Sequence, residues 1–447
     1  MKTNQTPKVL LVGNSARGHA IAEAIMRSKH NPILFVYMKA NNPGIAALAE
    51  KVEIGGYDQP GRIAEFAESH DASLAIIDSE EPLCHGVVDA LEWIGIPTVG
   101  PKQKLAMIET SKGGARLLMA KHHIPGSPKF RIFRTMDGIK DYLKENLPVV
   151  LKPDGLTGGK GVMIQGEHFA TIAEALKICR DILTKHQAVV IEKKLEGEEF
   201  SLQCFCDGRN IVAMPPVQDH KRRLNGDLGL NTGSMGSYSC ANHLLPFLTP
   251  AELEQAADIV RRTVRALHLE TGLFYRGIIY GGFMVTRDGV KLIEFNARFG
   301  DPEAINVLAL LETDFVDICQ AITNGRLHKL PVSFRRLATV VKYVVPFNYG
   351  LLKDQRAAEG SDLIKIGNLG KATLYYSSVN HDQAGCHLTS SRAAAVLGTA
   401  PGLSEAERIA EKAARAITGA VAHRTDIGTA ALIARRVRHM EELNKQK

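Results

Sequence analysis

The stretch that decides the fold reads Glu294-Phe295-Asn296-Ala297-Arg298, directly after the mainly apolar run 290–293. Alternate side chains of a β-strand share one face, so we expect Glu294, Asn296 and Arg298 to line a common surface. A carboxylate and an amide oxygen suit Mg²⁺, and a guanidinium suits a planar oxyanion. The pattern therefore predicts a strand that holds a divalent cation beside a phosphate. An exposed edge strand with ordinary alternation is the competing interpretation of these five residues.

The composition indicates a multidomain globular chain. Its 447 residues are enough for about three domains with large cores. The formal charge of +7 fits small anionic substrates. The sequence has no arginine-rich stretch interleaved with aromatic residues, so we expect no nucleic-acid partner. The N-terminus is polar rather than a signal peptide and no apolar run reaches transmembrane length, so we expect no membrane partner.

The seven cysteines are scattered and odd in number, which indicates neither a zinc site nor a disulfide framework. Even the close pair Cys204 and Cys206 lies in a strand-like run, where the two side chains point to opposite faces. A reducing, cytoplasmic location is the resulting expectation.

Strand-like and helix-like segments alternate over the first hundred residues. Short apolar runs predict strands at residues 8–12, 33–37, 74–77 and 98–99. Helical patterns lie between them, at residues 18–27, 45–50, 62–69 and 86–93. This alternation predicts an α/β fold class with a doubly wound parallel sheet, and we place this first domain at residues 1–108. Ligands are expected at the carboxyl ends of its strands.

The loop after the first strand, residues 13–19, has neither the Lys-Ser/Thr of a Walker A loop nor the spacing of a dinucleotide fingerprint. Backbone amides at the start of the following helix can still take a phosphate, helped by Arg17. A plain tight turn is an equally open alternative.

Two further domains follow. Strands are predicted at residues 149–152 and 189–192, and residues 251–267 have the apolar spacing of an amphipathic helix. The tail beyond about residue 330 has strands again, at residues 338–345 and 372–376, and then a helix at 405–417. We therefore place a second domain at residues 109–330 and a small α/β domain at residues 331–447.

The turn Gly158-Gly159-Lys160-Gly161 offers successive backbone amides and one cation, which together can wrap a polyphosphate. Lys152 ends a predicted buried strand, where a lysine usually has an anionic partner. Two lysines around a glycine turn predict a phosphate clamp, although a glycine-rich turn is more often only a turn.

A nucleoside site is predicted where the strand at residues 189–192 ends. The segment Glu192-Lys193-Lys194-Leu195 leads from one subdomain to the next, and the backbone of such a hinge can bind an adenine edge. Glu199, seven residues after Glu192, can accept hydrogen bonds from ribose hydroxyls. A solvated charge run is the alternative for this cluster.

Two polar segments follow, at residues 218–222 and 231–238. The first contains Asp219, His220, Lys221 and Arg222 without apolar periodicity, which predicts a functional loop, with a basic surface loop as the alternative. The second has glycines at positions 233 and 236, a spacing that suits close approach of the backbone to a ligand.

In kind and order, these motifs resemble those of the ATP-grasp superfamily. Within it, three segments are similar to the phosphoribosylamine–glycine ligase family: Gln218-Asp219-His220-Lys221-Arg222, Asn231-Thr232-Gly233-Ser234-Met235-Gly236 and Arg298-Phe299-Gly300-Asp301-Pro302-Glu303. Residues 156–161, 304–308 and 338–346 are similar to the archaeal-type branch of that family. The resemblance extends from Val9 to Gly428. It implies an ATP-grasp fold with a mobile ATP-binding subdomain at residues 112–197 and a catalytic subdomain at residues 198–330.

The resemblance implies that ATP, glycine and 5-phosphoribosylamine give glycinamide ribonucleotide, ADP and phosphate through glycyl phosphate, in de novo purine biosynthesis. Glu294 and Asn296 would hold Mg²⁺ or Mn²⁺. The implied catalytic residues are Arg298, beside the acyl phosphate, with Lys221 and Asp219. The implied ATP-binding residues are Lys112, Lys152, Gly158, Gly159, Lys160, Gly161, Glu192, Lys193, Leu195 and Glu199. The implied residues for the other two substrates are His220, Arg222, Asn231, Thr232, Gly233, Met235, Gly236, Asp301, Arg17 and Glu80. Small-molecule substrates are the expected partners of a monomer or homodimer.

Three loops depart from the usual pattern of the family. The first loop reads Ser15-Ala16-Arg17-Gly18-His19 where the family has Gly-Gly-Arg-Glu-His, so an acid is missing. Residues 78–83 keep the acid at Glu80 but lose a Gly-Pro pair, and residues 229–236 have a leucine and a serine in place of a proline and a glycine. Because these changes concentrate where the amine substrate is expected, two alternatives stay open. One is an ATP-grasp ligase with a different amine acceptor or acid, and the other is a non-catalytic nucleotide-binding homologue.

Overall fold

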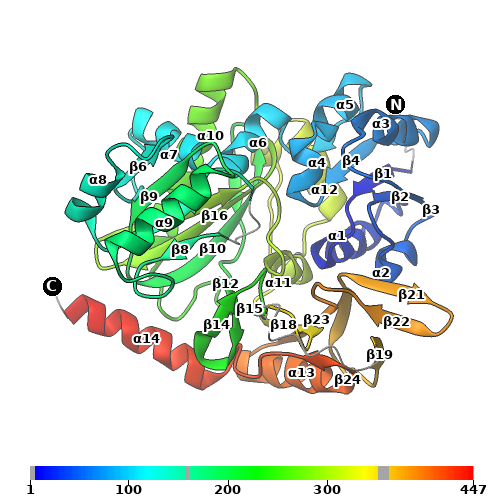
Figure 1. The fold of residues 1–447 in the computed structure, drawn as a ribbon. Coiled ribbons are helices and arrows are strands. Elements are labelled where there is room, and N and C mark those ends of the chain that lie inside the picture. The colour runs from blue at the N-terminus through cyan, green and yellow to red at the C-terminus, as the bar shows by residue number, and fades with distance from the viewer. Residues whose placement is uncertain (1–5, 157–160, 351–361, 446–447) are drawn as a thin grey trace.

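The computed structural model describes residues 6–156, 161–350 and 362–445 (Figure 1). The chain begins with a five-stranded parallel sheet in the order β3-β2-β1-β4-β5, which confirms the predicted doubly wound sheet. Its strands are β1 (Lys8–Val12), β2 (Ile33–Met38), β3 (Lys51–Ile54), β4 (Leu74–Ile77) and β5 (Thr98–Val99). The central strands are continuous apolar runs because helices cover both faces of a parallel sheet.

The helices around this first sheet differ from the prediction at one position. They are α1 (Ala16–Met26), α2 (Pro43–Ala46), α3 (Pro60–Ser69), α4 (Glu80–Cys84), α5 (Val87–Trp93) and α6 (Gln103–Thr110). The helix predicted at residues 45–50 was wrong. Asn42 caps a single helical turn that ends at Ala46, and residues 51–54 then form β3, which pairs with β2 at the edge of the sheet.

A second, antiparallel sheet has the order β6-β9-β7-β8 and its own hydrophobic core. Its strands are β6 (Phe130–Phe133), β7 (Val149–Pro153), β8 (Met163–Ile164) and β9 (Val189–Lys193). The helices α8 (Ile139–Asn146) and α9 (Ile172–Leu183) supply apolar side chains to this core. Because Thr171 caps α9 with a complete capping box, the start of that helix is fixed by its own sequence.

A third sheet, in the order β11-β10-β16-β17, contains Glu294, Phe295 and Asn296 at the end of β17. Its strands are β10 (Glu198–Asp207), β11 (Ile211–Ala213), β16 (Arg276–Thr286) and β17 (Gly289–Asn296). The helices of this part of the chain are α7 (Lys112–Lys121), α10 (Pro250–Thr271), α11 (Glu303–Leu310) and α12 (Phe315–Thr323). The amphipathic helix predicted at residues 251–267 is thus confirmed as part of α10.

The polar segments at residues 218–222 and 231–238 are each part strand and part loop, so the loop predicted at residues 218–222 is limited to His220 and Lys221. They contain β12 (Gln218–Asp219), β13 (Arg222–Leu224), β14 (Leu228–Asn231) and β15 (Gly236–Ser239). β13 and β14 form a hairpin, and β12 pairs with β15. These strands have no apolar alternation because they are very short and several of their polar side chains face a cavity.

The C-terminal part adds two more sheets. β18 (Ala338–Pro346), β23 (Ala394–Ala400) and β20 (Thr373–Tyr376) extend the β12-β15 pair, and β25 (Val421–Ala422) pairs with β18. A smaller sheet contains β19 (Leu363–Ile366), β21 (Val379–Asp382), β22 (Gly385–Leu388) and β24 (Ile417–Thr418). The last helices are α13 (Leu403–Ala416) and α14 (Ala430–Lys445). Among the described residues, no helix is both long enough and apolar enough to cross a membrane.

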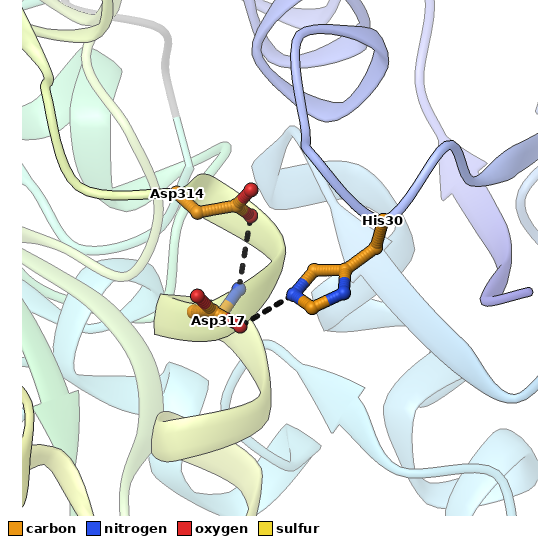
Figure 2. Close-up of side chains that lie close together, drawn as sticks. All are labelled: His30, Asp314 and Asp317. Carbon is orange, nitrogen blue, oxygen red and sulfur yellow. Dashed lines mark hydrogen bonds and ion pairs between the residues drawn. The ribbon is translucent and has the colours of Figure 1, made fainter. Parts of the chain in front are cut away.

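A polar cluster joins the first sheet region to α12 (Figure 2). His30 Nε2 lies 2.7 Å from Asp317 Oδ1, and Lys29 Nζ lies 2.7 Å from Asp317 Oδ2. Asp314 caps α12 and also accepts hydrogen bonds from Ser28 Oγ at 2.9 Å. Because both carboxylates already have cationic or N–H and O–H donors, the cluster is explained as a contact that fixes the end of α1 against α12.

Candidate active site

Two cavities meet at the carboxyl end of β17. The first, of about 390 Å³, lies between β17, the loops of the first sheet and residues of the C-terminal part. The second, of about 320 Å³, lies between β9, β10 and the β13–β14 hairpin. The residues that line both are Glu192, Asp219, Lys221, Ile293 and Glu294. A ligand in one cavity can therefore touch the same side chains as a ligand in the other.

The acid, the amide and the guanidinium of this stretch all line the first cavity, and so does Phe295, which alternation placed on the opposite face. β17 ends at Asn296, so Arg298 lies just beyond the strand. Arg298 Nη2 donates to Asn296 Oδ1 at 3.0 Å, and Lys221 Nζ lies 3.8 Å from Glu294 Oε1. Burial alone would raise the pKa of Glu294, but Lys221 and two further lysines outweigh it and lower that pKa. Glu294 is therefore a charged oxygen donor near neutral pH.

Arg298 lies at the centre of a charge network that reaches the first sheet. Its Nε is 3.1 Å from Glu80 Oε2, and its Nη2 is 2.8 Å from Glu109 Oε1. Arg17 Nη2 lies 3.1 Å from the same Glu80 oxygen. Burial would raise the pKa of Glu80, but Arg298 and Arg17 hold it well below its usual range. The network thus brings Arg17 and Glu80, both predicted from the first domain, to the end of β17.

Glu192 is buried between two cations. Its Oε1 accepts a hydrogen bond from Arg116 Nε at 2.7 Å, and its Oε2 lies 2.8 Å from Lys152 Nζ. Burial opposes ionisation, but Lys152 and Arg116 lower the pKa of Glu192 to about 2. Lys152 also donates to the carbonyl of Ile293 at 3.2 Å, which ties this predicted phosphate-binding lysine to β17.

The second cavity contains the predicted hinge. It is lined by Lys152, Lys193, Leu195 and Glu199, with Met284 and Ile293 as apolar neighbours. Glu199 lies at the start of β10 with an exposed side chain, as a group that binds a ligand hydroxyl requires. An apolar floor beside a strand edge suits a flat heterocycle with polar edges.

The glycine-rich turn is only partly within the described residues. Gly161 is described, with a φ of +108°, and the next residue, Val162, lines the second cavity. Gly158, Gly159 and Lys160 lie outside the described residues. Lys112 lines the first cavity, where its Nζ donates to the carbonyl of Gly155 at 2.8 Å.

The polar strands divide between the two cavities. Asp219 and Lys221 line both, whereas Thr232 and Gly233 line the first. Burial and the negative charge of Glu303 raise the pKa of Asp219 to about 7. Burial would lower the pKa of Lys221, but the surrounding carboxylates, Glu294 first among them, raise it. An acid that titrates near neutrality thus lies beside a lysine that stays charged.

His220, Arg222 and Asn231 line the second cavity, apart from Arg298. Arg222 forms an ion pair with Glu167 and donates to the carbonyl of Gly229 at 2.9 Å. Burial, followed by the positive charge of Arg424, lowers the pKa of His220 to about 3. His220 is therefore a neutral, buried side chain rather than a titrating group.

Met235 and Gly236 are not among the residues that line either cavity. The Met235 side chain is fully buried in the core. Gly236 has a φ of +143°, and a Cβ there would lie 2.2 Å from the carbonyl oxygen of Val341. The spacing of the glycines at positions 233 and 236 thus has two causes. Gly233 lines the first cavity, whereas Gly236 allows close packing of β15 on β18.

An acid from a different strand occupies the space beside Gly18. Asp78, at the end of β4, accepts hydrogen bonds from Ser15 N at 3.3 Å and from Ser15 Oγ at 2.8 Å. A Cβ at Gly18 would lie 2.4 Å from Asp78 Oδ2, and a Cβ at Gly13 would lie 1.9 Å from Asp78 Cγ. The altered residues at positions 15, 18 and 78 therefore fit one another. The acid that is missing from the first loop is replaced by an acid that enters from β4.

Several residues of the first cavity were not selected from the sequence. They are Glu109, Arg116, Tyr280, Glu303 and Arg392. Tyr280 donates its hydroxyl to Glu303 Oε1 at 3.0 Å, and Arg392 Nη2 lies 3.2 Å from Asp301 Oδ2. Asp301, which was predicted, also accepts a hydrogen bond from Tyr343. The only sequence signal was the turn after Arg298, which carries Asp301 and Glu303 together.

Two sequence models of one family match this chain. The phosphoribosylglycinamide synthetase N domain matches residues 7–109, and the ATP-grasp (A) domain of the same synthetase matches residues 110–304. A phosphoribosylamine–glycine ligase of Methanosarcina barkeri is 47% identical over 98% of this chain and 99% of its own length. The ligase of the same name from Methanocaldococcus jannaschii is 45% identical over 98% of this chain and all of its own length.

Solved structures agree with the fold. A crystal structure of a phosphoribosylamine–glycine ligase from Thermotoga maritima is similar to this chain with a TM-score of 0.77 and 26% identity, covering 94% of this chain and all of that chain. The biotin carboxylase domain of a Hydrogenobacter thermophilus 2-oxoglutarate carboxylase has a TM-score of 0.71 at 16% identity, covering 99% of this chain and 96% of that chain. At that identity the likeness is one of fold alone.

Proposed function

The chain belongs to the phosphoribosylglycinamide synthetase family, and we propose that it joins glycine to 5-phosphoribosylamine at the expense of ATP. The products are glycinamide ribonucleotide, ADP and phosphate, as in de novo purine biosynthesis. One observation carries this proposal: two cavities share a wall that contains Glu294, Lys221 and Asp219. A phosphoryl donor in one cavity can then meet a carboxylate and an amine in the other.

The second cavity is the ATP site. The hinge Glu192–Leu195 borders the adenine, and Glu199 accepts hydrogen bonds from the ribose. Lys152 neutralises phosphate charge from one side and Lys112 from the other, because Lys152 lines the second cavity and Lys112 the first. The loop at residues 158–161, of which the structure describes only Gly161, keeps its predicted role in phosphate binding. His220, Arg222 and Asn231 also belong to this cavity, which revises their assignment to glycine or the sugar phosphate.

The donor set on β17 fits a hard divalent cation, Mg²⁺ or Mn²⁺. Glu294 offers a charged carboxylate and Asn296 an amide oxygen, both on the surface of the first cavity. The ion would neutralise the charge that develops on the transferred phosphoryl group. Lys221 remains positively charged beside Glu294, and it supports the same phosphate oxygens.

The reaction proceeds in two displacements. A carboxylate oxygen of glycine attacks the γ-phosphorus of ATP, and the bond to ADP breaks, which gives glycyl phosphate. The amine of phosphoribosylamine then attacks the glycyl carbonyl carbon, and phosphate leaves with its electron pair. Arg298, which Glu80 and Glu109 hold in place, stabilises the negative charge of the acyl phosphate.

Asp219 accepts the proton that the attacking amine loses. Its carboxyl lines the first cavity, and its pKa of about 7 is matched to proton transfer near neutrality. His220 is the competing candidate, but it lines the second cavity, and burial lowers its pKa to about 3. Geometry and acidity both favour Asp219.

Phosphoribosylamine occupies the part of the first cavity that Arg17, Glu80, Thr232, Gly233 and Asp301 border. Arginine is the side chain best suited to bind a phosphate in two-point fashion, and Arg17 is the arginine of this cavity that comes from the first domain, on α1. The mutual fit of Ser15, Gly18 and Asp78 supports retention of this amine, because the loop that carries Arg17 is rebuilt rather than lost.

The assembly and the location of the protein complete the proposal. We place it in the cytoplasm as a monomer or homodimer with small-molecule substrates. All seven cysteines are free thiols, which supports a reducing compartment.

The test is product identification with each substrate omitted in turn. The purified protein is incubated with ATP, Mg²⁺, glycine and phosphoribosylamine generated in situ, and ADP and glycinamide ribonucleotide are measured. Formation of the ribonucleotide only in the complete mixture is the expected result. ADP release with glycine and a different amine would indicate a different acceptor. Background hydrolysis with every amine and acid would indicate a nucleotide-binding homologue.

A further inference from the structure

The C-terminal helix α14 lies against two walls of the second cavity. Figure 1 shows α14 beginning beside β14 and running below the sheets to the C-terminal end of the chain. Leu432, Met440 and Leu443 are the residues that this helix buries. Its polar residues Arg436 and His439 form ion pairs with other parts of the chain.

Arg436 bridges two carboxylates that belong to different elements. Its Nη1 lies 3.2 Å from Glu198 Oε2, at the start of β10. Its Nη2 lies 2.5 Å from Asp227 Oδ2, in the turn of the β13–β14 hairpin. A planar guanidinium can hold two carboxylates at once, which the point charge of an ammonium cannot do equally well.

Glu198 links this bridge to the nucleoside end of the cavity. Its side chain is only 4% exposed, and it also accepts from His439 Nδ1 at 2.7 Å. Gln218 Nε2 lies 3.5 Å from Glu198 Oε2 and donates to the carbonyl of Glu199 at 3.1 Å. Glu198, the first residue of β10, and the adjacent Glu199 are therefore both held by Gln218.

Asp227 links the bridge to the hairpin. It accepts hydrogen bonds from Arg424 at 3.0 Å and from Arg435 as well as from Arg436. The hairpin strands on either side of this turn carry Arg222 and Asn231, which line the second cavity. The turn itself lines the same cavity through Asp227.

Arg436 also reaches the cavity directly. It lines the second cavity, and its Nε is buried without a hydrogen-bond partner among the described residues. Both ring nitrogens of His220, which lines the same cavity, are likewise buried without a hydrogen-bond partner in the described part of the chain. Buried polar atoms of this kind normally find a partner, so this end of the cavity has donor capacity left for a ligand or water.

We propose that Arg436 is a positioning residue for nucleotide binding. It holds the start of β10 and the β13–β14 hairpin at the separation that encloses the nucleoside. The inference rests on the proposed role of the second cavity as the ATP site. When Arg436 is neutralised, Glu198 and Asp227 lose the cation that bridges them, while Arg424 and Arg435 stay on Asp227 and His439 stays on Glu198. The two walls then move apart and the nucleotide is held less firmly.

The test is the affinity for MgADP, measured by titration calorimetry on the full chain. Arg436→Gln is compared with Arg438→Gln, which removes the same charge from an exposed position on the same helix. We expect the Kd to rise about tenfold for Arg436→Gln and to stay within about twofold for Arg438→Gln. Arg436→Lys keeps the charge without the planar fork and is expected to fall between the two.

Steady-state kinetics separate a positioning role from general loss of structure. For Arg436→Gln the KM for ATP is expected to rise by the same factor as the Kd, while the kcat and the KM for glycine stay within about twofold of the unsubstituted protein. An unchanged Kd for MgADP would overturn the proposal, as would an equal loss in kcat and in both KM values. An equal effect of Arg438→Gln would also overturn it.

If Arg436→Gln fails to fold by circular dichroism, Asp227→Asn replaces it, since Asp227 belongs to only one of the two walls; an unchanged Kd there overturns the proposal. If the unsubstituted protein binds MgADP but forms no glycinamide ribonucleotide, the proposed acceptor is rejected. The role of Arg436 is then still decided by the Kd values of the variants. No MgADP binding would reject both.

Discussion

At the scale of single residues, the site depends on buried ion pairs in which each charge offsets the unfavourable burial of the other. Glu192 is only 5% exposed and lies between Arg116 and Lys152. Its pKa falls from 4.5 to about 2 because these cations outweigh the effect of burial. A group whose pKa is lower in the folded state stabilises the fold above its unfolded pKa, and that contribution is lost as the pH falls through the folded value.

We therefore expect the free energy of unfolding to fall further between pH 6 and pH 4 in the unsubstituted protein than in Glu192→Gln. The difference should be about 1 kcal/mol, because the variant has no carboxyl to titrate at this position. Urea unfolding at both pH values measures it. Equal pH dependence in the two proteins would show that the folded pKa of Glu192 is not depressed.

Asp219 gives the second prediction at this scale. Its pKa is raised to about 7 by burial and by Glu303, so its charged form grows as the pH rises through neutrality. If Asp219 accepts the proton of the amine, kcat/KM for phosphoribosylamine should rise with pH up to a plateau above about pH 7. Asp219→Asn should lower the plateau about 100-fold and abolish that rise. An Asn variant with full activity at pH 8 would remove Asp219 from the chemistry.

At the scale of elements, the path of the short polar strands places residues that are adjacent in sequence beside different cavities. Lys221 lines both cavities, whereas the adjacent Arg222 lines only the second, where the β13–β14 hairpin meets the hinge. Which cavity each residue lines can be predicted only when the pairing of these strands is known. The sequence of these strands has no apolar alternation, so a loop was predicted and the side of each residue could not be inferred.

Substitutions in the β13–β14 hairpin and at Arg17 are therefore expected to affect the KM of different substrates. Arg222→Gln should raise the KM for ATP several-fold and leave the KM for phosphoribosylamine nearly unchanged, whereas Arg17→Gln should do the reverse. Steady-state kinetics with each substrate varied in turn compare the two variants. If Arg222→Gln mainly raised the KM for the sugar phosphate, the division of residues between the cavities would be incorrect.

Other elements were predictable because their patterns are strong. The continuous apolar runs at β1, β2 and β4 indicated a parallel sheet, and the apolar spacing in α10 indicated an amphipathic helix. The stretch Glu294–Asn296 was predictable as a strand from its own residues, whereas Arg298 lies beyond the end of that strand. Glu109 and Arg116 carried no such signal. Their partners Arg298 and Glu192 are distant in sequence, and a lone charge in a helix is usually solvated.

At the scale of the whole molecule, the site is assembled from segments far apart in the chain. Arg17 and Glu80 come from α1 and α4 of the first domain, Glu294 and Arg298 from the third sheet and its end, and Arg392 from the C-terminal part. The order of motifs indicated an ATP-grasp ligase, but the contribution of Arg392 could not be inferred, because nothing in the sequence indicates where the C-terminal sheet packs. The same holds for Arg436 on α14.

The whole arrangement also explains how the altered loops remain compatible with one another. Positions 15, 18 and 78 differ from the usual family pattern, and in the structure Ser15 donates to Asp78 beside Gly18. Each change alone would leave a gap or a clash, whereas together they restore an acid next to Arg17. In the structure, these three of the departures from the family pattern form one connected cluster.

The most direct measurement of the central claim follows an oxygen atom. Glycine labelled with ¹⁸O in its carboxylate is turned over with ATP and phosphoribosylamine, and the released phosphate is analysed by mass spectrometry. Because phosphate leaves from glycyl phosphate with one carboxylate oxygen, each phosphate should carry one ¹⁸O, with glycinamide ribonucleotide formed in equal amount. Unlabelled phosphate, or labelled phosphate without that ribonucleotide, would contradict the account.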